Sequence, residues 1–164
     1  MDQIYMDGCE DEDFKLLLEF NEKAGLFKEM VSTERLTYYD VSASTVTDIG
    51  ARIELKKRDA NTFMYPTLFM EDTKLNIVLD YLCYGDIPLY INFMKDGNVV
   101  IFNLSKLSKR PEYNERRTYS KGYNSWEYQG KNELDMCDAW IYGHAGNLIR
   151  KPLKIRNDYG VFRN

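Results

Sequence analysis

The first part of the chain has apolar residues at helical spacing. Between residues 11 and 27, the apolar residues Phe14, Leu17, Leu18 and Phe20 recur near the period of an α-helix, and acidic residues occupy the first turn, where the helix dipole favours negative charge. Gly25 follows the last of these positions, and glycine is common where a helix ends. The pattern predicts a helix that closes at Gly25.

The residues after this helix have the composition of two β-strands. Residues 36–46 are rich in β-branched and aromatic side chains, which favour extended structure. Residues 51–56 alternate apolar and charged side chains, which is the period-two pattern of a strand with two different faces. The sequence Asp48-Ile49-Gly50 between them suits a tight reversal. The two segments therefore predict a β-hairpin.

A helical pattern returns in residues 68–84 and is followed by a second pair of strands. The apolar face of this helical segment carries Leu75, Val78, Leu79 and Leu82. Gly85 ends the pattern. Residues 87–94 and 99–104 are then apolar segments joined through Asp96-Gly97, which is a strong hairpin signal. This half of the chain predicts a helix and then a second hairpin.

Beyond residue 105 the periodic pattern is lost. Residues 106–131 are polar and aromatic with few periodic apolar positions, which predicts a long loop or a mobile arm. The order helix, strand, strand, helix, strand, strand predicts an α/β (α+β) fold around one mixed sheet. We expect a single domain over residues 1–164, with a core at about residues 11–104 and a basic, aromatic extension over residues 105–164.

The composition excludes several classes of protein. The chain has 164 residues, of which 44% are hydrophobic, enough for one compact core. No apolar run approaches the roughly 18 residues needed to cross a bilayer, and the residues after Met1 are acidic where a secretory signal is basic. Cys9, Cys83 and Cys137 suit neither a disulfide framework nor a metal knuckle. We expect a soluble, cytoplasmic protein with reduced cysteines.

The charge is unevenly distributed along the chain. The net charge is −4, yet residues 104–121 carry an excess of basic side chains, namely Lys106, Lys109, Arg110, Arg116, Arg117 and Lys121. Such a segment favours a polyanion, although a solvated surface of mixed sign would have the same composition. Aromatic residues are interleaved with these cations: Tyr113, Tyr119, Tyr123, Trp126 and Tyr128. They are able to stack on bases, or alternatively to pin a loop to the core.

Three charged residues in the first predicted hairpin can share one site. Glu54 and Lys56 are two positions apart on a strand, so their side chains leave the same face with Cα atoms about 6.6 Å apart. Asp40 lies on the preceding strand, where pairing can bring its carboxylate beside Glu54. Two carboxylates so placed suit Mg²⁺ or Mn²⁺, and Lys56 can orient a water for attack on a phosphodiester. The alternative is an exposed strand face with an ion pair of little energetic value.

Two features of the sequence compete with this assignment. An acid followed two places later by lysine also occurs at residues 13–15 and 72–74, although both lie in helical patterns, where such positions diverge. Asp48 is a second acid ahead of Glu54, but it sits in the turn sequence, whereas Asp40 lies inside the strand pattern. The prediction is therefore Asp40 rather than Asp48.

The residues around this trio resemble the core of the PD-(D/E)XK nuclease superfamily. Tyr38-Tyr39-Asp40-Val41 precedes Glu54-Leu55-Lys56-Lys57-Arg58 by fourteen residues, with a helix before and a helix after. The similarity covers roughly residues 11–104. It is greatest to small nucleases of phages and mobile elements, because a proline-containing segment and a helix follow over residues 65–74. The resemblance implies a restriction-endonuclease-like core, a mixed central sheet flanked by helices, and a location in the cytoplasm of a bacterial or phage-infected cell.

The resemblance also implies roles for individual residues. It implies the catalytic residues Asp40, Glu54 and Lys56, and the metal-binding positions Asp40, Glu54 and Leu55. Accessory groups would be an acid of the first helix, Glu19 or Glu22, and a polar residue of the later helix, Glu71 or Lys74. The expected nucleic-acid-binding cations are Lys57, Arg58, Arg116, Arg117 and Lys121.

The expected function is that of a Mg²⁺- or Mn²⁺-dependent nuclease that hydrolyses DNA phosphodiester bonds. Many nucleases of this kind act as dimers, so the resemblance also allows a homo-oligomer. Because the superfamily includes members that have lost activity, the alternative is an inactive nuclease-like domain that binds nucleic acid or serves in phage structure or assembly. A purely structural partner protein is a third, weaker alternative.

Overall fold

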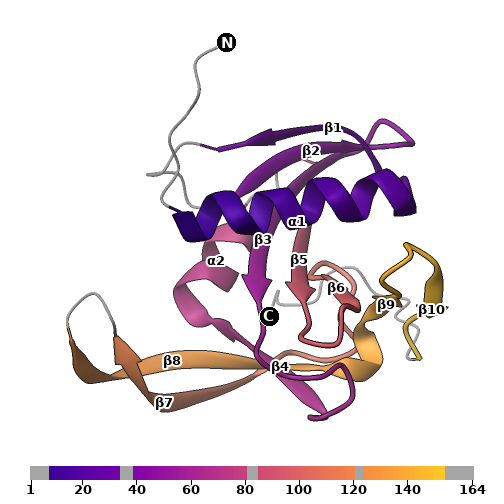
Figure 1. Ribbon diagram of the computed structural model, residues 1–164. Helices are drawn as coiled ribbons and strands as arrows, with labels where there is room; N and C mark the ends of the chain where they lie inside the picture. The colour runs from indigo at the N-terminus through magenta and orange to yellow at the C-terminus, as the bar shows by residue number, and fades with distance from the viewer. Residues whose placement is uncertain (1–7, 34–38, 81–84, 121–123, 154–164) are drawn as a thin grey trace.

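A seven-stranded sheet forms the centre of the molecule (Figure 1). The computed structural model describes residues 8–33, 39–80, 85–120 and 124–153. The sheet order is β1 (Phe27–Ser32), β2 (Val41–Thr45), β3 (Gly50–Lys57), β5 (Ile87–Phe93), β6 (Val99–Asn103), β9 (Trp140–Tyr142) and β10 (Leu148–Arg150). The central pair, β3 and β5, is parallel, and the other neighbours are antiparallel. The sheet is therefore mixed, as the sequence predicts.

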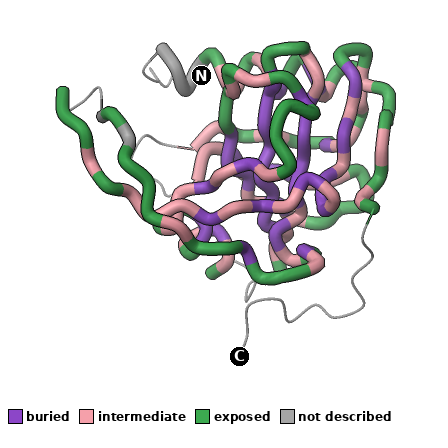
Figure 2. Tube along the Cα trace, turned by 90° about the horizontal axis from the view of Figure 1, so that it is seen from below, coloured by how far each residue is buried: buried purple, intermediate pink, exposed green. Residues whose placement is uncertain are grey.

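Both faces of this sheet are covered. The helix α1 (Gly8–Ala24) lies on one face. The other face packs against α2 (Asp72–Asp80) and against a three-stranded sheet of order β4 (Thr67–Glu71), β8 (Ser125–Asp135) and β7 (Glu112–Ser120). Figure 2 shows that buried residues concentrate in the strands between these layers. The fold is thus α+β with a restriction-endonuclease-like arrangement of a mixed sheet and flanking helices.

The two hydrophobic clusters follow from alternation along the central strands. On β5, Leu89, Ile91 and Phe93 belong to the cluster under α1, which also contains Leu17 and Phe20 of that helix. The side chains between them, beginning with Tyr90, face the cluster built with α2 and β4. Successive side chains of a strand point to opposite faces, so one strand contributes to both cores. The side chains of β5 are therefore packed on both faces of the sheet.

Both predicted hairpins are confirmed. β2 and β3 pair antiparallel, and Asp48 in the connecting turn has a positive φ of 65°. β5 and β6 pair antiparallel, and Gly97 in their turn has a φ of 87°. Gly25 follows α1 with a φ of 63°, which agrees with its predicted role at the end of the helix. At these three positions the local sequence was enough to predict where the chain turns or the helix ends.

The helix predicted over residues 68–84 is wrong at its beginning. Residues 67–71 form β4, and α2 runs only from Asp72 to Asp80. The burial of Leu68 and Met70 alternates with half-buried neighbours, because β4 pairs with β8. Short apolar segments fit a strand and a helix equally well, so tertiary pairing decided the outcome. Leu75 and Val78 are buried as predicted, and Leu82 lies outside the described residues.

The long loop predicted over residues 106–131 is also wrong for most of its length. β7 and β8 pair over their whole lengths, from Glu112 opposite Glu133 to Ser120 opposite Ser125. This hairpin, residues 112–135 and named the arm below, projects from the body in both overall views (Figures 1 and 2). Its outer part has solvent on both faces, so the sequence carries no apolar alternation. The pattern that identifies a half-buried strand is missing for that reason.

Three short strands at the edges of the main sheet were not predicted. β1 is mostly exposed, and β9 and β10 have three residues each. β9 pairs with β6, which brings residues 140–142 of the predicted extension into the central sheet. Among the described helices, none is long and apolar enough to span a membrane.

Candidate functional site

Asp40 and Glu54 meet near the carboxyl end of β3. Val41 pairs with Ile53, so the antiparallel register places Asp40 opposite Glu54. The amide of Asp40 donates a hydrogen bond to the Ile53 carbonyl oxygen at 3.0 Å. Its carboxylate oxygen Oδ2 accepts one from the Leu55 amide at 2.7 Å. The Asp40 carboxylate therefore lies against the backbone between Glu54 and Lys56.

Glu54 is a buried acid, with 3% of its surface exposed. Ile53 and Leu55 on either side pack into the cluster under α1, so alternation directs Glu54 to the opposite face, beside α2. Burial raises the pKa of Glu54 to about 7, and the negative charge of Asp40 contributes to the same shift. A carboxyl group in this position gains stability from a nearby cation, because a positive charge favours its ionised form.

In this structure the cation is Lys74 of α2. The Lys74 ammonium donates to an oxygen of Glu54 and forms an ion pair with it. Burial lowers the pKa of Lys74, but the charge and hydrogen bond of Glu54, together with the charges of Asp40 and Glu71, raise it more, so the pKa lies above the usual range of a lysine. Glu71, the last residue of β4, adds another negative charge that acts on both groups. The structure thus brings the two predicted accessory residues, Glu71 and Lys74, to Glu54.

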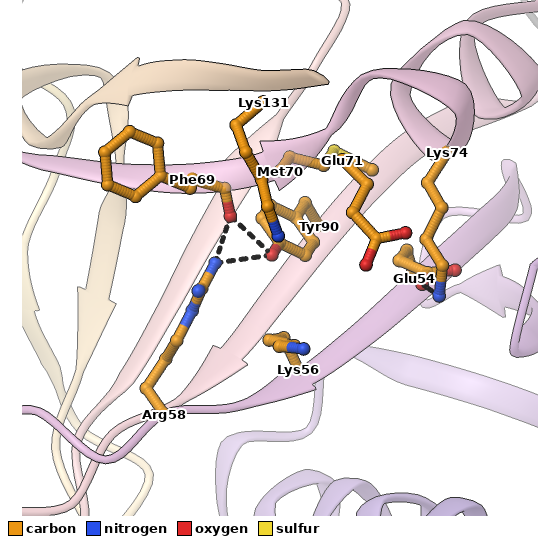
Figure 3. A pocket seen from close by; sticks show the side chains of 9 residues that line it. All are labelled: Glu54, Lys56, Arg58, Phe69, Met70, Glu71, Lys74, Tyr90 and Lys131. Carbon is orange, nitrogen blue, oxygen red and sulfur yellow. Dashed lines mark hydrogen bonds and ion pairs between the residues drawn. The ribbon is translucent and has the colours of Figure 1, made fainter. Parts of the chain in front are cut away.

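Positive charge predominates in the pocket around Glu54 (Figure 3). Its charged lining residues are Glu54, Lys56, Arg58, Glu71, Lys74 and Lys131. Lys131 comes from β8 and was not identified from the sequence. Burial lowers the pKa of Lys131, and the neighbouring cations lower it further, whereas Glu71 raises it. Four cations against two acids make the pocket suitable for an anionic group such as a phosphate.

Lys56 and Lys74 are both exposed cations of this group, but only Lys74 is paired with Glu54. Lys56 lines the pocket with Glu54 and also the adjoining pocket that contains Asp13 and Asp40. Within the described part of the chain, its ammonium has no hydrogen-bond or ion-pair partner. Lys56 therefore lies between the two carboxylates and the other cations, where a ligand can reach it.

Arg58 is tied into the protein instead. Its Nε donates to Asn92 Oδ1 at 2.9 Å, and its Nη2 donates to the Phe69 carbonyl oxygen and to Tyr90 Oη at 2.6 Å. Burial raises the pKa of Tyr90 to about 12, and the Tyr90 hydroxyl in turn donates to the Phe69 oxygen at 2.9 Å. Arg58 thereby joins β3 to β4 and β5, and its positive charge contributes to the pocket from a fixed position.

The acid that α1 brings to the site is Asp13. It lines a pocket with Asp40, Leu55, Lys56 and Lys74. Burial raises the pKa of Asp13, and the charge of Asp40 raises it further. The sequence held a signal for this position, because Asp13 lies four residues before the fully buried Leu17 and therefore on the core-facing side of the helix.

The predicted helix acids Glu19 and Glu22 do not join this group. Glu19 lines a different groove, together with Lys23 and His144, and Glu22 is exposed. Asp48 is also remote, since its exposed carboxylate pairs with Lys28 at 2.6 Å. Lys57 pairs with Glu12 at 2.9 Å at the surface.

The remaining predicted DNA-binding cations are on the arm. The Arg116 guanidinium lies 3.7 Å from the centre of the Phe69 ring and 3.4 Å from Glu133. Arg117 lies 5.1 Å from the ring centre of Trp126. Lys121 lies outside the described residues. Arg116 lines a groove with Arg58 and Phe69 beside the Glu54 pocket, whereas Arg117 lies further out on the arm.

The donor set around Asp40 fits a hard divalent cation. In the ranges that the structure describes, no three His, Cys, Asp or Glu side chains already form a metal-binding group. Mg²⁺ commonly binds one or two carboxylates and retains several waters, so Asp40 and Glu54 suffice by number and by type. Leu55 can contribute only its backbone carbonyl oxygen, which is also a hard donor. The ion pair with Lys74 occupies one oxygen of Glu54, so a cation would compete with this ammonium.

Comparison with known proteins supports the fold. No family model matches the sequence, and no curated protein matches it. The structure is similar to that of Hjc, a Holliday junction resolvase from the archaeal hyperthermophile Archaeoglobus fulgidus, with a TM-score of 0.50. The match covers 78% of this chain and 84% of that chain at 14% sequence identity. The chain thus shares the fold of this protein, in agreement with the mixed sheet and flanking helices that the resemblance implied.

Proposed function

We propose that the protein is a divalent-metal-dependent nuclease that hydrolyses DNA phosphodiester bonds at the end of β3. The proposal rests mainly on the hydrogen bond of 2.7 Å that the Leu55 amide donates to the Asp40 carboxylate. This bond holds Asp40 beside Glu54 and Lys56, which are the residue types that a metal-assisted hydrolysis needs. The similarity to a resolvase supports the same reaction class, since it supplies a fold on which this chemistry occurs.

Asp40, Glu54 and the Leu55 carbonyl oxygen would hold Mg²⁺ or Mn²⁺. When bound, the ion supplies Lewis acidity toward the phosphoryl oxygens and promotes ionisation of a water near neutral pH. Asp13 faces the same group of acids from α1 and would act as an accessory acid. Burial raises the pKa of both Asp13 and Glu54, and the charge of Asp40 adds to each shift; a divalent cation bound beside Asp40 would offset these costs.

The cations of the pocket have separate roles in this proposal. Lys56, which is exposed and reaches both pockets, orients the attacking water or stabilises charge that develops on the phosphoryl oxygens. Lys131 and Arg58 are more enclosed and favour binding of the phosphate group itself. Lys74 favours the ionised form of Glu54 before the metal binds and then becomes available to the substrate.

A nuclease-like domain that binds DNA without turnover is the second candidate. The ion pair between Lys74 and Glu54 favours it, because this pair neutralises the buried carboxylate without a metal. The two candidates differ in metal affinity. Calorimetric titration with Mn²⁺ at pH 8 should give binding that Asp40→Asn weakens at least tenfold, whereas the second candidate predicts no heat of binding.

Cleavage of DNA is the direct test of the leading proposal. Single-stranded, duplex and branched DNA should be cut by the wild-type protein in Mg²⁺ or Mn²⁺, and Asp40→Asn should reduce the rate by at least about 10²-fold. Asp48→Asn is the matched control, since it removes an exposed acid of the same hairpin that pairs with Lys28. Equal loss of activity in both variants, or cutting by Asp40→Asn at the wild-type rate, would refute the assignment.

A further inference from the structure

The outer half of the arm carries a group of exposed aromatic rings. The exposed fractions are 43% for Tyr119, 59% for Trp126 and 77% for Tyr128. Tyr119 is paired with Trp126, and Arg117 is paired with Tyr128. Paired residues and residues two positions apart share one face of a hairpin, so these four side chains lie on the same face. They are named the aromatic cluster below.

Within the aromatic cluster, Trp126 contacts Tyr119 and Arg117 rather than the core. The centres of the Tyr119 and Trp126 rings are 5.5 Å apart with an angle of 63° between planes, and Arg117 lies 5.1 Å from the Trp126 ring centre. No described side chain between Glu112 and Lys131 is buried. Tyr119, Trp126 and Tyr128 therefore do not pin a loop to the core, which was one of the two roles open from the sequence, whereas Tyr123 lies outside the described residues. The contact between Tyr119 and Trp126 holds these two rings in place at the surface.

The aromatic cluster is close to the proposed catalytic pocket along β8. Lys131 lines that pocket, and Tyr128 and Trp126 are three and five residues further out, on the opposite face of the strand. At about 3.4 Å per residue, they lie roughly 10 and 17 Å from Lys131. This corresponds to about three to five nucleotides at the 3.4 Å rise of stacked DNA. Pairing with β4 ends at Lys131, so in the described residues the outer part of β8 has no strand on that side.

The chemistry of the aromatic cluster favours nucleobases over a protein surface. It combines rings with polar ends and a guanidinium, and it contains no aliphatic side chain. Trp126 and Tyr128 are about 6.8 Å apart along the strand, twice the spacing of stacked bases, which leaves room for one base between two rings. Bases in a duplex are already stacked on their neighbours, so only unpaired bases can use such rings without first being separated.

We propose that the aromatic cluster binds unpaired bases and gives the protein a preference for DNA with a single-stranded segment beside the cleavage site. The proposal deepens the proposed nuclease function and rests on it for the nature of the ligand. The rings hold bases on one face of the hairpin, and the phosphate groups of the same strand pass the open edge of β8 to reach Lys131 on the other face. Cleavage then occurs within a few nucleotides of the junction between paired and unpaired DNA.

Binding without metal isolates the arm from catalysis. The full-length protein in a metal-free buffer is titrated with a 15-nucleotide oligothymidine and with a 15-base-pair duplex, both carrying a fluorescent label. The single strand should bind more tightly, and Trp126→Ala and Tyr128→Ala should each weaken its binding at least fivefold, with less than a twofold change for the duplex. Trp126→Phe should restore most of the loss, because phenylalanine keeps a stacking face.

Phe63→Ala is the matched control for this titration. Phe63 is 63% exposed, lies outside the arm and packs beside Arg150, so its loss should leave both affinities unchanged. The protein contains two tryptophans, so in a Trp140→Phe background the fluorescence of Trp126 alone should be quenched by the single strand. Unchanged affinity in both alanine variants, or an equal loss for duplex and single strand, would overturn the inference.

Three further outcomes separate this inference from the proposed function. If Trp126→Ala reduces self-association of the protein and leaves DNA affinity unchanged, the aromatic cluster is a protein contact and the inference is wrong. If the wild type shows no metal-dependent cleavage but the ring variants still lose single-strand binding, the nuclease function fails and the inference about unpaired bases stands. If the ring variants bind as the wild type does and cleavage still depends on Asp40, only the inference fails.

Discussion

The end of β3 and the outer arm place their distinctive side chains in opposite environments. At the end of β3, Glu54 is buried and is paired with Lys74, so electrostatic interactions are strong and pKa values shift. On the arm, Trp126 and Tyr128 are exposed and contact mainly their neighbours on the hairpin. The charged groups at the end of β3 suit binding of ions and phosphate groups, whereas the arm presents flat aromatic rings to a ligand. Their separation predicts that variants affect catalysis or recognition, but not both equally.

Exchange of Lys56 for alanine should have the largest effect. Lys56 is exposed at the two pockets, whereas the adjacent Lys57 pairs with Glu12 at the surface. We expect Lys56→Ala to reduce the rate of DNA cleavage in Mg²⁺ by at least about 10²-fold, with little change in single-strand affinity. Lys57→Ala, which removes the same charge one residue away, should retain most activity. Single-turnover rates and metal-free binding measure the two properties separately, and similar rates for both variants would contradict the assignment of Lys56.

The pH dependence of stability tests the electrostatics of the buried acid. Glu54 has a pKa of about 7 in the folded protein and a usual value of 4.5. The folded protein therefore binds a proton at Glu54 more tightly than the unfolded chain does. This difference stabilises the fold fully below pH 4.5, and the stabilisation is lost as the pH rises through 7. The free energy of unfolding should fall by up to about 3 kcal/mol over this range, since each pKa unit corresponds to about 1.4 kcal/mol. Urea unfolding of the metal-free protein between pH 5 and 8 measures it.

Glu54→Gln is the reference for this measurement, because glutamine is similar in shape and does not titrate. The difference between the two unfolding free energies should grow between pH 5 and 8 in favour of the variant. Addition of Mn²⁺ at pH 8 should stabilise the wild type more than the variant. Parallel pH profiles would show that burial does not perturb Glu54 as described.

Much of the site at the end of β3 could be predicted from the amino-acid sequence, but little of the structure of the arm could. Asp40, Glu54 and Lys56 lie in one hairpin, so strand alternation and a turn sequence were enough to bring them together. Lys131 reaches the pocket only because β8 pairs with β4, and such long-range pairing leaves no local pattern. The ring positions were visible in the sequence, but their exposure depends on the arm being a hairpin with solvent on both faces.

Asp13, and not the predicted Glu19 or Glu22, is the acid of α1 that lies near Asp40. Glu19 and Glu22 were chosen by residue type within the helix, whereas position on the helix face decides which acid reaches Asp40. Asp13 precedes Leu17 by four residues and lies on the face that packs on the sheet. An acid on an otherwise apolar helix face was the available signal.

Removal of the Lys74 charge should have a moderate effect on stability. Lys74→Met keeps the length of the side chain and leaves Glu54 without its ion pair, so Glu54 should bind a proton more tightly. Because Lys74 is 45% exposed, we expect a loss of about 1–2 kcal/mol at pH 8 and less at pH 5, where Glu54 is protonated. Lys28→Met, which breaks the exposed pair with Asp48, is the control and should change stability by less than about 0.5 kcal/mol at either pH. A pH-independent loss in Lys74→Met would indicate lost packing instead.

The smallest expected effect is that of Trp126→Ala on stability, and it decides whether the arm is independent of the core. Trp126 and Leu134 belong to the same strand, but Trp126 is 59% exposed and Leu134 is 1% exposed. Leu134→Ala removes a buried side chain from the cluster with α2 and should cost about 2–5 kcal/mol. Trp126→Ala should change the unfolding free energy by less than about 0.5 kcal/mol, because its ring contacts little beyond Arg117 and Tyr119. Urea unfolding of both variants compares the two ends of β8 directly. A loss above 1 kcal/mol for Trp126→Ala would mean that the rings stabilise the fold, and their exposure would then be a poor guide to ligand binding.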